Sequence, residues 1–292
     1  MADSLRGWVL RIAALAARWL PGGVKRWLYR LGPLTRGLRS TLNRAAPTGW
    51  TDVHVASGGL AGMLLRLDLQ IEKELWLGTY EPELQTCVRD LVRPGMTVYD
   101  LGANIGYLTL LFARAVGEDG RVVAFEPLPG NLERLAEHIG RNSFAERVTV
   151  VPAAVADRQG RRRFYVRTSS AMGKLEGAAG RSLQDEESIM VHAIDLDSYV
   201  GNSRDRPPDV IKIDIEGGEV LALPGMRRTL REVRPAILLE IHGPEAARAV
   251  WQELGKASYA LHQLERPYPP LSNPDGLGWR SRVLALPQAV TK

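Results

Sequence analysis

Four residues in the last third of the chain have side chains that could move a proton. Lys212, Asp214 and Glu216 alternate along an apolar run that predicts a strand, and His242 ends the next such run. Because side chains alternate across a strand with a period of two, we expect the first three to share one side. The carboxyl ends of neighbouring parallel strands meet at one edge of a sheet, so His242 would join them there. An imidazole and two carboxylates so placed can remove a proton from a hydroxyl, and we take all four residues as candidate catalytic groups.

Each of the four also has a structural interpretation. Asp214 on a buried strand must be paired or functional, and Lys212 suits an ion-pair partner better than a base. Glu216 could cap a helix that starts after the two glycines that follow it in the sequence. His242 could stabilise the turn formed by the Gly-Pro pair that comes after it. The acids and the imidazole could also hold a divalent cation that binds two substrate oxygens. Their spacing does not require a cation, and from the sequence we assign no metal ligand.

A glycine-containing turn earlier in the chain has the residues of a ligand site. Asp100, Gly102, Asn104 and Gly106 form the pattern D-x-G-x-N-x-G between a predicted strand and a predicted helix. Such a turn lets a ligand approach the backbone closely, and the open amides of the helix start face it. Glu126 ends the next predicted strand, at a spacing that suits a carboxylate accepting hydrogen bonds from a ribose diol.

Two cofactor classes compete for this turn. A dinucleotide-binding turn has the pattern G-x-G-x-x-G, in which the middle glycine makes room for a pyrophosphate. Here Asn104 stands in that place, and the acid Asp100 precedes the turn. An acid would repel a pyrophosphate but suits a ligand that carries an ammonium and a sulfonium. The pattern therefore favours S-adenosylmethionine over NAD.

Alternating strands and helices are predicted around both groups of residues. The strands expected to alternate with helices are 97–101, 121–125, 148–152, 210–215 and 236–241, and the helices are 107–116, 129–142 and 226–233. Further strands are expected at 161–168, 189–194, 258–263 and 282–286. An earlier hairpin (53–56 and 63–68) is followed by helices expected at 70–76 and 82–91. Such alternation indicates an α/β fold with a mostly parallel twisted sheet and helices on both faces.

The composition is that of a globular protein. Of 292 residues, 45% are apolar and 24% charged, which excludes disorder as the dominant state. Cys87 is the single cysteine, so a disulfide scaffold is excluded and a reducing compartment, the cytoplasm, is expected. Charge-free apolar runs are too short to span a bilayer, and Arg11 and Arg18 interrupt the one stretch that could serve as a secretory signal.

The basic charge is concentrated at the N-terminus. Residues 1–50 carry nine Lys and Arg against one acid, a net +8, whereas the whole chain carries +5, so the remainder carries −3. Apolar residues recur at helical spacing over 5–20 and again over 24–42, and three of them are Trp8, Trp19 and Trp27. These paired amphipathic helices could lie on an anionic membrane surface. Alternatively, they pack on the main domain or at the seam of a homodimer.

These patterns divide the chain into two parts. Residues 1–49 form the basic helical segment and 50–292 the main domain. Within the main domain we expect a cofactor half over about 70–157, an insertion over about 158–200, and the catalytic strands with the C-terminal tail over 208–292.

The sequence resembles the FkbM family of S-adenosylmethionine-dependent methyltransferases. The matching stretches are 99–106 (YDLGANIG), 125–127 (FEP), 153–157 (AAVAD), 194–199 (IDLDSY), 211–217 (IKIDIEG) and 234–242 (RPAILLEIH). The likeness covers roughly residues 50–287 and leaves out the basic segment. It implies a Rossmann-like class I methyltransferase fold. It also implies methylation of a hydroxyl oxygen, often on a sugar or a polyketide-type natural product.

Site residues follow from the resemblance by position. The four residues of the glycine turn would line the methionine and ribose part of the cofactor, Glu126 would hold the ribose hydroxyls, and Ala154 would border the adenine. We therefore expect an O-methyltransferase that acts on a glycan, glycolipid or natural product, in the cytoplasm or at the inner membrane surface.

Two other functions are disfavoured. Nucleic-acid methylation fits poorly, because the main domain is net acidic and lacks an Asn/Asp-Pro-Pro-Tyr/Phe motif after the fourth strand. A binding module without catalysis fits poorly while Asp100, Glu126 and Asp214 are all present.

Overall fold

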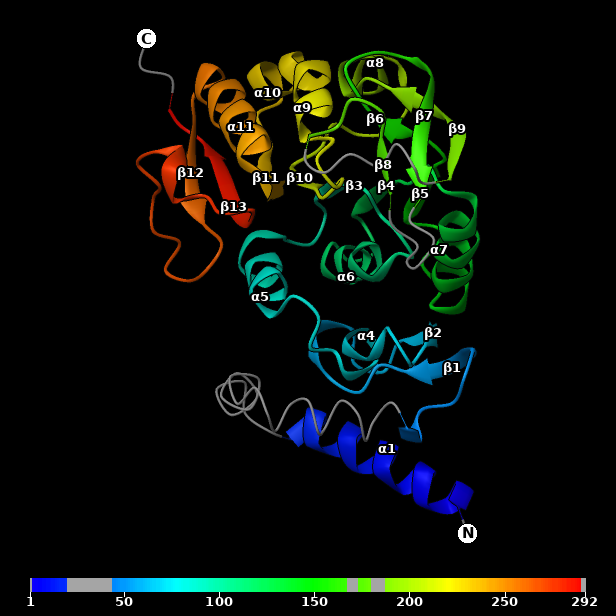
Figure 1. The fold of residues 1–292 in the computed structure, drawn as a ribbon. Helices are drawn as coiled ribbons and strands as arrows, with labels where there is room; N and C mark the ends of the chain where they lie inside the picture. Colours follow the sequence, from blue (N-terminus) through cyan, green and yellow to red (C-terminus); the bar gives the residue numbers. More distant parts are fainter. Residues whose placement is uncertain (1, 20–43, 167–172, 180–186, 290–292) are drawn as a thin grey trace. The chain divides into compact units, whose positions relative to one another are not determined.

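The structure is a computed structural model that describes residues 2–19, 44–166, 173–179 and 187–289 (Figure 1). The chain forms two compact units, Met1–Gln85 and Thr86–Lys292. The boundary between the basic segment and the main domain, expected at 49/50, stays a prediction.

The first unit contains a long helix and a β-hairpin. Its elements are α1 (Ala2–Trp19), β1 (Trp50–His54), η1 (Gly58–Leu60), β2 (Leu64–Asp68), α4 (Lys73–Leu77) and the start of α5 (Pro82–Leu91). The hairpin and the first basic helix agree with the sequence prediction, whereas the second predicted helix, 24–42, lies outside the described residues. Within the described part of the chain, no helix is both long and apolar enough to cross a membrane.

Glycine allows the hairpin turn and α4 to meet. Gly78 ends α4 with a φ of +72°, and a Cβ there would lie 1.8 Å from the carbonyl oxygen of Ser57. The amide of Ala56 donates to the carbonyl of Trp76 at 2.8 Å. A side chain at Gly78 would therefore separate the two segments.

A seven-stranded mixed sheet forms the centre of the second unit. The strands lie in the order β12-β13-β11-β10-β3-β4-β5. Neighbours from β5 to β11 are parallel, and β13 runs antiparallel to both β11 and β12. The strands are β3 (Thr97–Leu101), β4 (Arg121–Phe125), β5 (Val148–Val151), β10 (Val210–Ile213), β11 (Ala236–His242), β12 (Tyr259–Gln263) and β13 (Arg280–Pro287). The predicted mostly parallel α/β sheet is confirmed.

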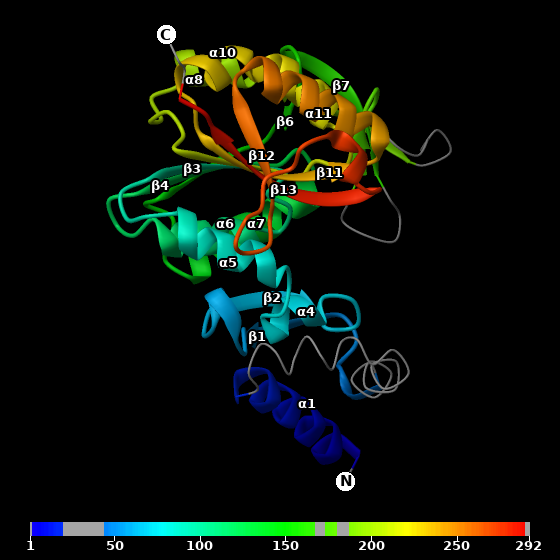
Figure 2. The same cartoon turned by 90° about the vertical axis from the view of Figure 1, so that its left-hand side faces the viewer.

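Helices cover both faces of this sheet. They are α6 (Tyr107–Ala115), α7 (Pro129–Arg141), α8 (Leu196–Asn202), α9 (Glu219–Ala222), α10 (Arg227–Glu232) and α11 (Pro244–Lys256). Figures 1 and 2 show α6 and α7 on one face and the other four on the opposite face. This is a Rossmann-like arrangement, as predicted. Helix α11 was not among the helices predicted from the sequence, although the buried residues of α11 recur at helical spacing.

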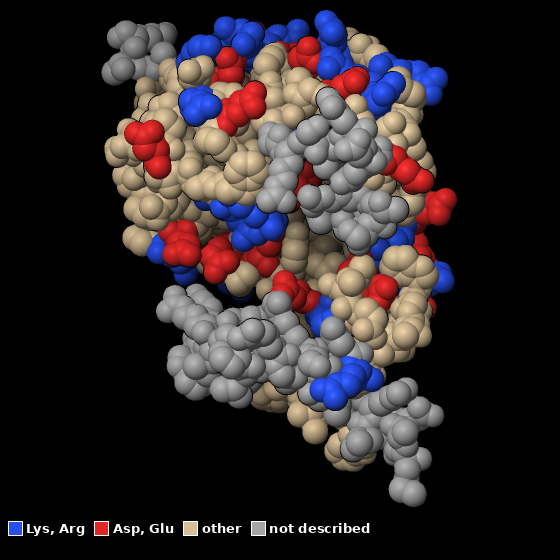
Figure 3. All heavy atoms as spheres, viewed as in Figure 1, with Lys and Arg blue, Asp and Glu red and all other residues tan. Residues whose placement is uncertain are grey.

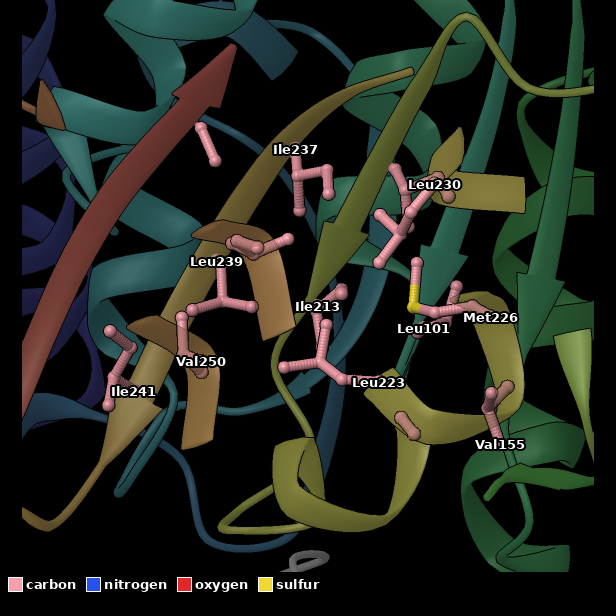
Figure 4. Close-up of a cluster of buried hydrophobic side chains, with 14 of the residues drawn as sticks. Leu101, Val155, Ile213, Leu223, Met226, Leu230, Ile237, Leu239, Ile241 and Val250 are labelled. Carbon is pink, nitrogen blue, oxygen red and sulfur yellow. The ribbon is translucent and has the colours of Figure 1, made fainter. Parts of the chain in front are cut away.

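The core lies between the sheet and helices α8 to α11. Ile213 and Leu239 from neighbouring strands are buried against Met226, Leu230 and Val250 (Figure 4). The sequences of the central strands are nearly continuous apolar runs, because both faces of these strands are covered. Three buried charged residues interrupt these runs, namely Asp100 on β3, Lys212 on β10 and Glu240 on β11.

A second, four-stranded sheet arises from the predicted insertion. Its order is β6-β9-β7-β8, from β6 (Ala154–Val155), β7 (Gly160–Val166), β8 (Gly173–Leu175) and β9 (Ser188–Ile194). The two strands expected here, 161–168 and 189–194, correspond to β7 and β9, which are antiparallel. The loop predicted between them lies partly outside the described residues.

Candidate active site

A buried ion pair joins β3 and β10 beside the glycine turn. Lys212 and Asp100 are register partners on these strands, and Nζ of Lys212 lies 3.0 Å from Oδ1 of Asp100. The hydroxyl of Thr109 donates to the other oxygen, Oδ2, at 2.6 Å. Asp100 is thus fully buried with its charge balanced by Lys212. Because Lys212 pairs with it, Asp100 is not a free acid that would favour a cationic ligand over a pyrophosphate, and its contact with a cofactor stays a prediction.

Lys212 also supports the backbone of the turn. Its Nζ donates to the carbonyl oxygens of Gly102 at 2.7 Å and Leu101 at 3.3 Å. The ammonium of Lys212 is thus occupied by two carbonyl oxygens and one carboxylate, all within the chain itself. Lys212 therefore has the geometry of a positioning residue, in line with its structural interpretation above.

The glycine turn touches the segment that follows β10. Gly102 has a φ of +80°, and a Cβ there would lie 2.0 Å from the carbonyl oxygen of Asp214. Gly106, with a φ of +91°, precedes the first residue of α6, and Asn104 takes a φ of +52° without being glycine. The turn needs left-handed backbone at these three positions, which explains two of its glycines.

Glu126 connects the two turns at the carboxyl ends of β3 and β4. Its Oε2 accepts the amide of Asn104 at 2.9 Å, and its Oε1 accepts the amide of Leu128 at 3.0 Å and Nδ2 of Asn131 at 3.1 Å. Burial raises the pKa of Glu126, and these hydrogen bonds oppose that shift. A carboxylate offers about four acceptor positions, so one remains for a donor such as a ribose hydroxyl.

Ala154 begins β6 just past the end of β5. Because β6 pairs in parallel with β9, the insertion sheet sets the position of this residue. Ala154 is buried. Its expected place beside an adenine stays a prediction.

The predicted strand 210–215 ends early, which corrects the expected geometry. β10 stops at Ile213, so Asp214 and Glu216 lie in the turn before α9. Glu216 has a φ of +53°, which no regular strand contains. Gly217 follows at φ +94°, where a Cβ would lie 2.2 Å from the carbonyl oxygen of Ala179. Lys212, on β10, therefore contacts the glycine turn after β3. Asp214 and Glu216 instead lie in the separate turn between β10 and α9.

The structure nevertheless brings both acids to His242, the last residue of β11. Nε2 of His242 lies 3.9 Å from Oδ1 of Asp214 and 3.8 Å from Oε2 of Glu216. The side chain of Glu216 is about one-third exposed, whereas that of Asp214 is largely buried. Three of the four candidate catalytic residues therefore converge, as the sequence predicts, and Lys212 does not join them.

Two further carboxylates complete this cluster. Nδ1 of His242 lies 3.1 Å from Oε1 of the fully buried Glu219, and Nε2 lies 3.3 Å from Oε1 of Glu240. Glu240 also accepts hydrogen bonds from Nε of Arg280 and, at 2.6 Å, from Nε of Arg282. Glu219, Glu240, Arg280 and Arg282 were not predicted as site residues from the sequence. A charged residue inside the apolar run 236–242 is the one signal that could have identified Glu240.

The surrounding carboxylates hold His242 in its protonated form. Burial alone would lower the pKa of His242, but the hydrogen bond with Glu219 and the neighbouring carboxylate of Glu240 outweigh it and raise that pKa to about 10. Burial likewise disfavours ionisation of Glu240, yet the neighbouring imidazole of His242 and the hydrogen bond from Arg280 hold its pKa at about 2. A cationic imidazole cannot accept a proton, so in this state the carboxylates are the candidate bases.

Glu216 has the properties of such a base. Burial raises its pKa, the positive charge of His242 opposes that shift, and the negative charge of Asp214 adds to it. A carboxylate with a raised pKa takes up a proton more readily near neutral pH. Asp214 lies on the same side of His242 and is the second candidate.

Comparison with known proteins found several methyltransferases that are similar to this chain. The hexuronic acid methyltransferase AglP of Haloferax volcanii is 27% identical over 203 residues, which are 68% of this chain and 79% of the relative. The 31-O-demethyl-FK506 methyltransferase FkbM of Streptomyces tacrolimicus is 29% identical over 182 residues, 53% of this chain and 69% of the relative. The crystal structure of the methyltransferase FkbM from Methylobacillus flagellatus is 19% identical with a TM-score of 0.43, covering 75% of this chain. The alignment spans about half, 53%, of that solved chain.

The profile of one protein family matches more than half of the sequence. It is the methyltransferase FkbM domain, and the match runs over residues 100–261. These limits include the glycine turn, Glu126, the turn with Asp214 and Glu216, and His242 on β11. The protein belongs to the FkbM family of methyltransferases.

Proposed function

We propose that this protein transfers the methyl group of S-adenosylmethionine to a hydroxyl oxygen of a glycan, a glycolipid or a natural-product scaffold. One observation carries the proposal: the glycine turn and the turn with the carboxylates pack backbone against backbone. A Cβ on Gly102 would overlap the carbonyl oxygen of Asp214, at 2.0 Å. Methyl transfer needs this proximity, because an enzyme gains most from holding donor and acceptor in line.

The two relatives support an oxygen acceptor. One is named for a hexuronic acid and the other for 31-O-demethyl-FK506. A sugar and a natural-product scaffold both carry aliphatic hydroxyls, which are poor nucleophiles until a base removes the proton. A carboxylate within reach of the acceptor is therefore part of the proposal.

Each group of residues has a proposed role. S-adenosylmethionine would supply the methyl group as an electrophilic carbon on a positively charged sulfur. Gly102 and Gly106 would leave room for this cofactor at the start of α6, and Glu126 would accept from its ribose. Asp214 or Glu216 would take the proton that the hydroxyl loses as its oxygen bonds to the methyl carbon and the carbon–sulfur bond breaks.

Calorimetry with the full chain tests the cofactor. We expect both S-adenosylmethionine and S-adenosylhomocysteine to bind, more weakly to Glu126→Gln and unchanged to Glu137→Gln, whose carboxylate pairs with Arg141 on the surface of α7. No binding of either compound at high micromolar concentration would contradict the proposal.

Tritiated methyl transfer to a cell lysate tests the acceptor class. Label in the glycan, lipid or small-molecule fraction supports the proposal, and label confined to RNA would favour nucleic-acid methylation. The charge distribution does not favour the latter. Figure 3 shows acidic and basic side chains mixed over the visible described surface of the second unit, without a single basic face.

We further propose that α1 holds the enzyme at an anionic membrane surface. Trp8, Ile12, Leu15 and Trp19 follow one another at helical spacing, and between 55% and 76% of each side chain is exposed. The guanidinium of Arg18 lies 5.8 Å from the ring centre of Trp19. An apolar stripe with tryptophans at its ends and an arginine beside it is typical of helices that lie in the interface of a lipid bilayer. Such a location would suit a lipid-linked acceptor.

A further inference from the structure

The side chains around His242 have the arrangement of metal ligands. One ligand atom each from Asp214, Glu240 and His242 can be chosen so that all three lie within 4.8 Å of one another. Nε2 of His242 is 3.3 Å from the nearest oxygen of Glu240 and 3.9 Å from that of Asp214. Such separations exceed those of good hydrogen bonds, but atoms that share one cation at about 2.0–2.2 Å lie at comparable separations.

The imidazole is oriented as metal-binding histidines are. Oε1 of Glu219 is an acceptor 3.1 Å from Nδ1, so Nδ1 carries a proton and Nε2 faces the other carboxylates. Metal-ligating histidines typically donate their second N–H to a carboxylate in this way, which fixes the tautomer and the ring orientation. Glu219 is fully buried, and its Oε1 also accepts the amide of Gly217 at 3.3 Å, which fixes the position of this carboxylate beside the imidazole.

Two buried polar atoms in this cluster lack hydrogen-bond partners among the described residues. They are Nε2 of His242 and Oε2 of Glu219. Buried polar atoms are nearly always satisfied, so each unsatisfied one requires an explanation such as an ion. The atom Nε2 points between the carboxylates, where a cation would complete its bonding.

The formal charges around the imidazole do not balance. The carboxylates of Asp214, Glu216, Glu219 and Glu240 face two cations, Arg280 and Arg282. Among the described residues these are four negative and two positive side chains, so a proton on the imidazole leaves −1, and a divalent cation in place of that proton leaves zero. Buried charge is costly unless it is compensated.

We infer that Asp214, Glu240 and His242 bind a divalent cation through Oδ1, Oε1 and Nε2. A set of two carboxylates and one imidazole with open positions suits Mn²⁺ or a related ion, because carboxylates favour Mn²⁺ and imidazole accepts first-row metals. The bound cation would take the place of the proton on Nε2. Arg280 shares Oε1 of Glu240, so the ion gains less from this ligand than from the other two.

The role of the cation rests on the proposed methyl transfer. A cation at this place would bind the acceptor oxygen in an open position and make its proton more acidic. Glu216 lies within 3.8 Å of Nε2 and would receive that proton. The carbon–sulfur bond breaks as the carbon–oxygen bond forms, so no further reactant is needed.

Binding of Mn²⁺ to the full chain tests the site without any activity assay. We expect the electron paramagnetic resonance signal of free Mn²⁺ to fall on addition of protein, with one ion bound per chain. Pulsed measurements on the bound ion should show coupling to an imidazole nitrogen. His242→Ala should abolish that coupling and weaken Mn²⁺ binding by about tenfold or more, the scale reported even for outer partners of metal ligands.

Two further variants separate a built site from general acidity. Glu219→Gln keeps an acceptor for Nδ1 but removes its charge, and should weaken Mn²⁺ binding by about 10- to 100-fold. Glu253→Gln removes a carboxylate of a surface ion pair with Arg227 and should leave Mn²⁺ binding unchanged. Circular dichroism confirms that each variant is folded.

Cofactor binding, measured on the same samples, keeps the two proposals distinguishable. Protein that binds S-adenosylmethionine but no Mn²⁺ at millimolar concentration would overturn the cation site and leave the methyl transfer standing. Mn²⁺ that binds equally to wild type and to His242→Ala would overturn it as well. Protein that binds Mn²⁺ with the imidazole coupling but no S-adenosylmethionine would support the site and contradict the proposed function.

Discussion

The ammonium of Lys212 lies 3.0 Å from the carboxylate of Asp100, and both side chains are almost completely buried. The same ammonium donates to the backbone of Gly102. This pair therefore connects the stability of the central sheet to the shape of the turn that would hold the cofactor.

Removing one member of this pair should destabilise the protein strongly. Lys212→Met leaves Asp100 charged and buried without its partner, at a cost of about 3–5 kcal/mol in the free energy of unfolding. The double variant Asp100→Asn/Lys212→Met should recover part of this loss. Urea unfolding measures both, with Arg227→Met in a surface ion pair as the control, whose midpoint should change little. A single variant as stable as wild type would mean that the pair does not hold the sheet.

Loss of the candidate base should affect turnover and spare cofactor binding. We expect Asp214→Asn to reduce turnover by about 10² or more and to change the affinity for S-adenosylmethionine only a few fold, because the carboxylate acts on the acceptor, either as the base or as a ligand of the inferred cation. His242→Ala should have the same effect, since the imidazole orients the carboxylates. Single-turnover kinetics on an identified acceptor, together with calorimetry, separate the two quantities. Full turnover of Asp214→Asn would assign proton removal to Glu216 or leave positioning alone as the source of catalysis.

Glu126 should show the opposite pattern. Glu126→Ala removes the acceptor for three donors that join the two turns, so S-adenosylmethionine should bind more weakly while turnover at saturating cofactor falls less. Titration of activity against cofactor concentration measures this division. An unchanged cofactor affinity would exclude Glu126 from the cofactor site.

Cys87 should be unreactive in the folded protein. Burial raises the pKa of its thiol to about 11, with a weaker opposing hydrogen bond from Tyr268. Only the thiolate reacts with alkylating reagents, so labelling should be slow at pH 7–8 and should accelerate as the pH approaches 11. Mass spectrometry of native and urea-unfolded samples checks this. Labelling of the native protein at the rate of the unfolded chain would show that the thiol is accessible.

The exposed stripe of α1 should bind anionic lipid. Vesicles with phosphatidylserine should carry the full chain in flotation at low salt and release it at high salt, because salt screens the attraction between arginines and lipid. Trp8→Ala/Trp19→Ala should weaken flotation, whereas Trp50→Ala, at another exposed tryptophan on β1, should not. No flotation at low salt, together with aggregation of a truncated protein that begins at Thr48, would instead assign α1 to a structural cap.

Local patterns were sufficient to predict most of the central sheet. Strands such as 121–125 and 97–101 agree with the structure residue for residue, because a strand covered on both faces is a short apolar run between turn residues. The glycine turn was predictable for a similar reason, since only glycine adopts its positive φ angles freely. The early end of β10 was not predictable, because residues 214–216 continue the alternating pattern of a strand although the backbone already turns at Glu216.

The partners of the candidate catalytic residues depended on tertiary structure. From the sequence alone we could predict the α/β class, the glycine turn and the acids and histidine at the sheet edge, because local spacing encodes them. Glu240 meets Arg282 through the register of two antiparallel strands more than forty residues apart, and Glu219 meets His242 through the packing of a helix start on the end of a strand. Register and packing arise from burial over the whole sheet, so no local spacing reports which charges will face one another.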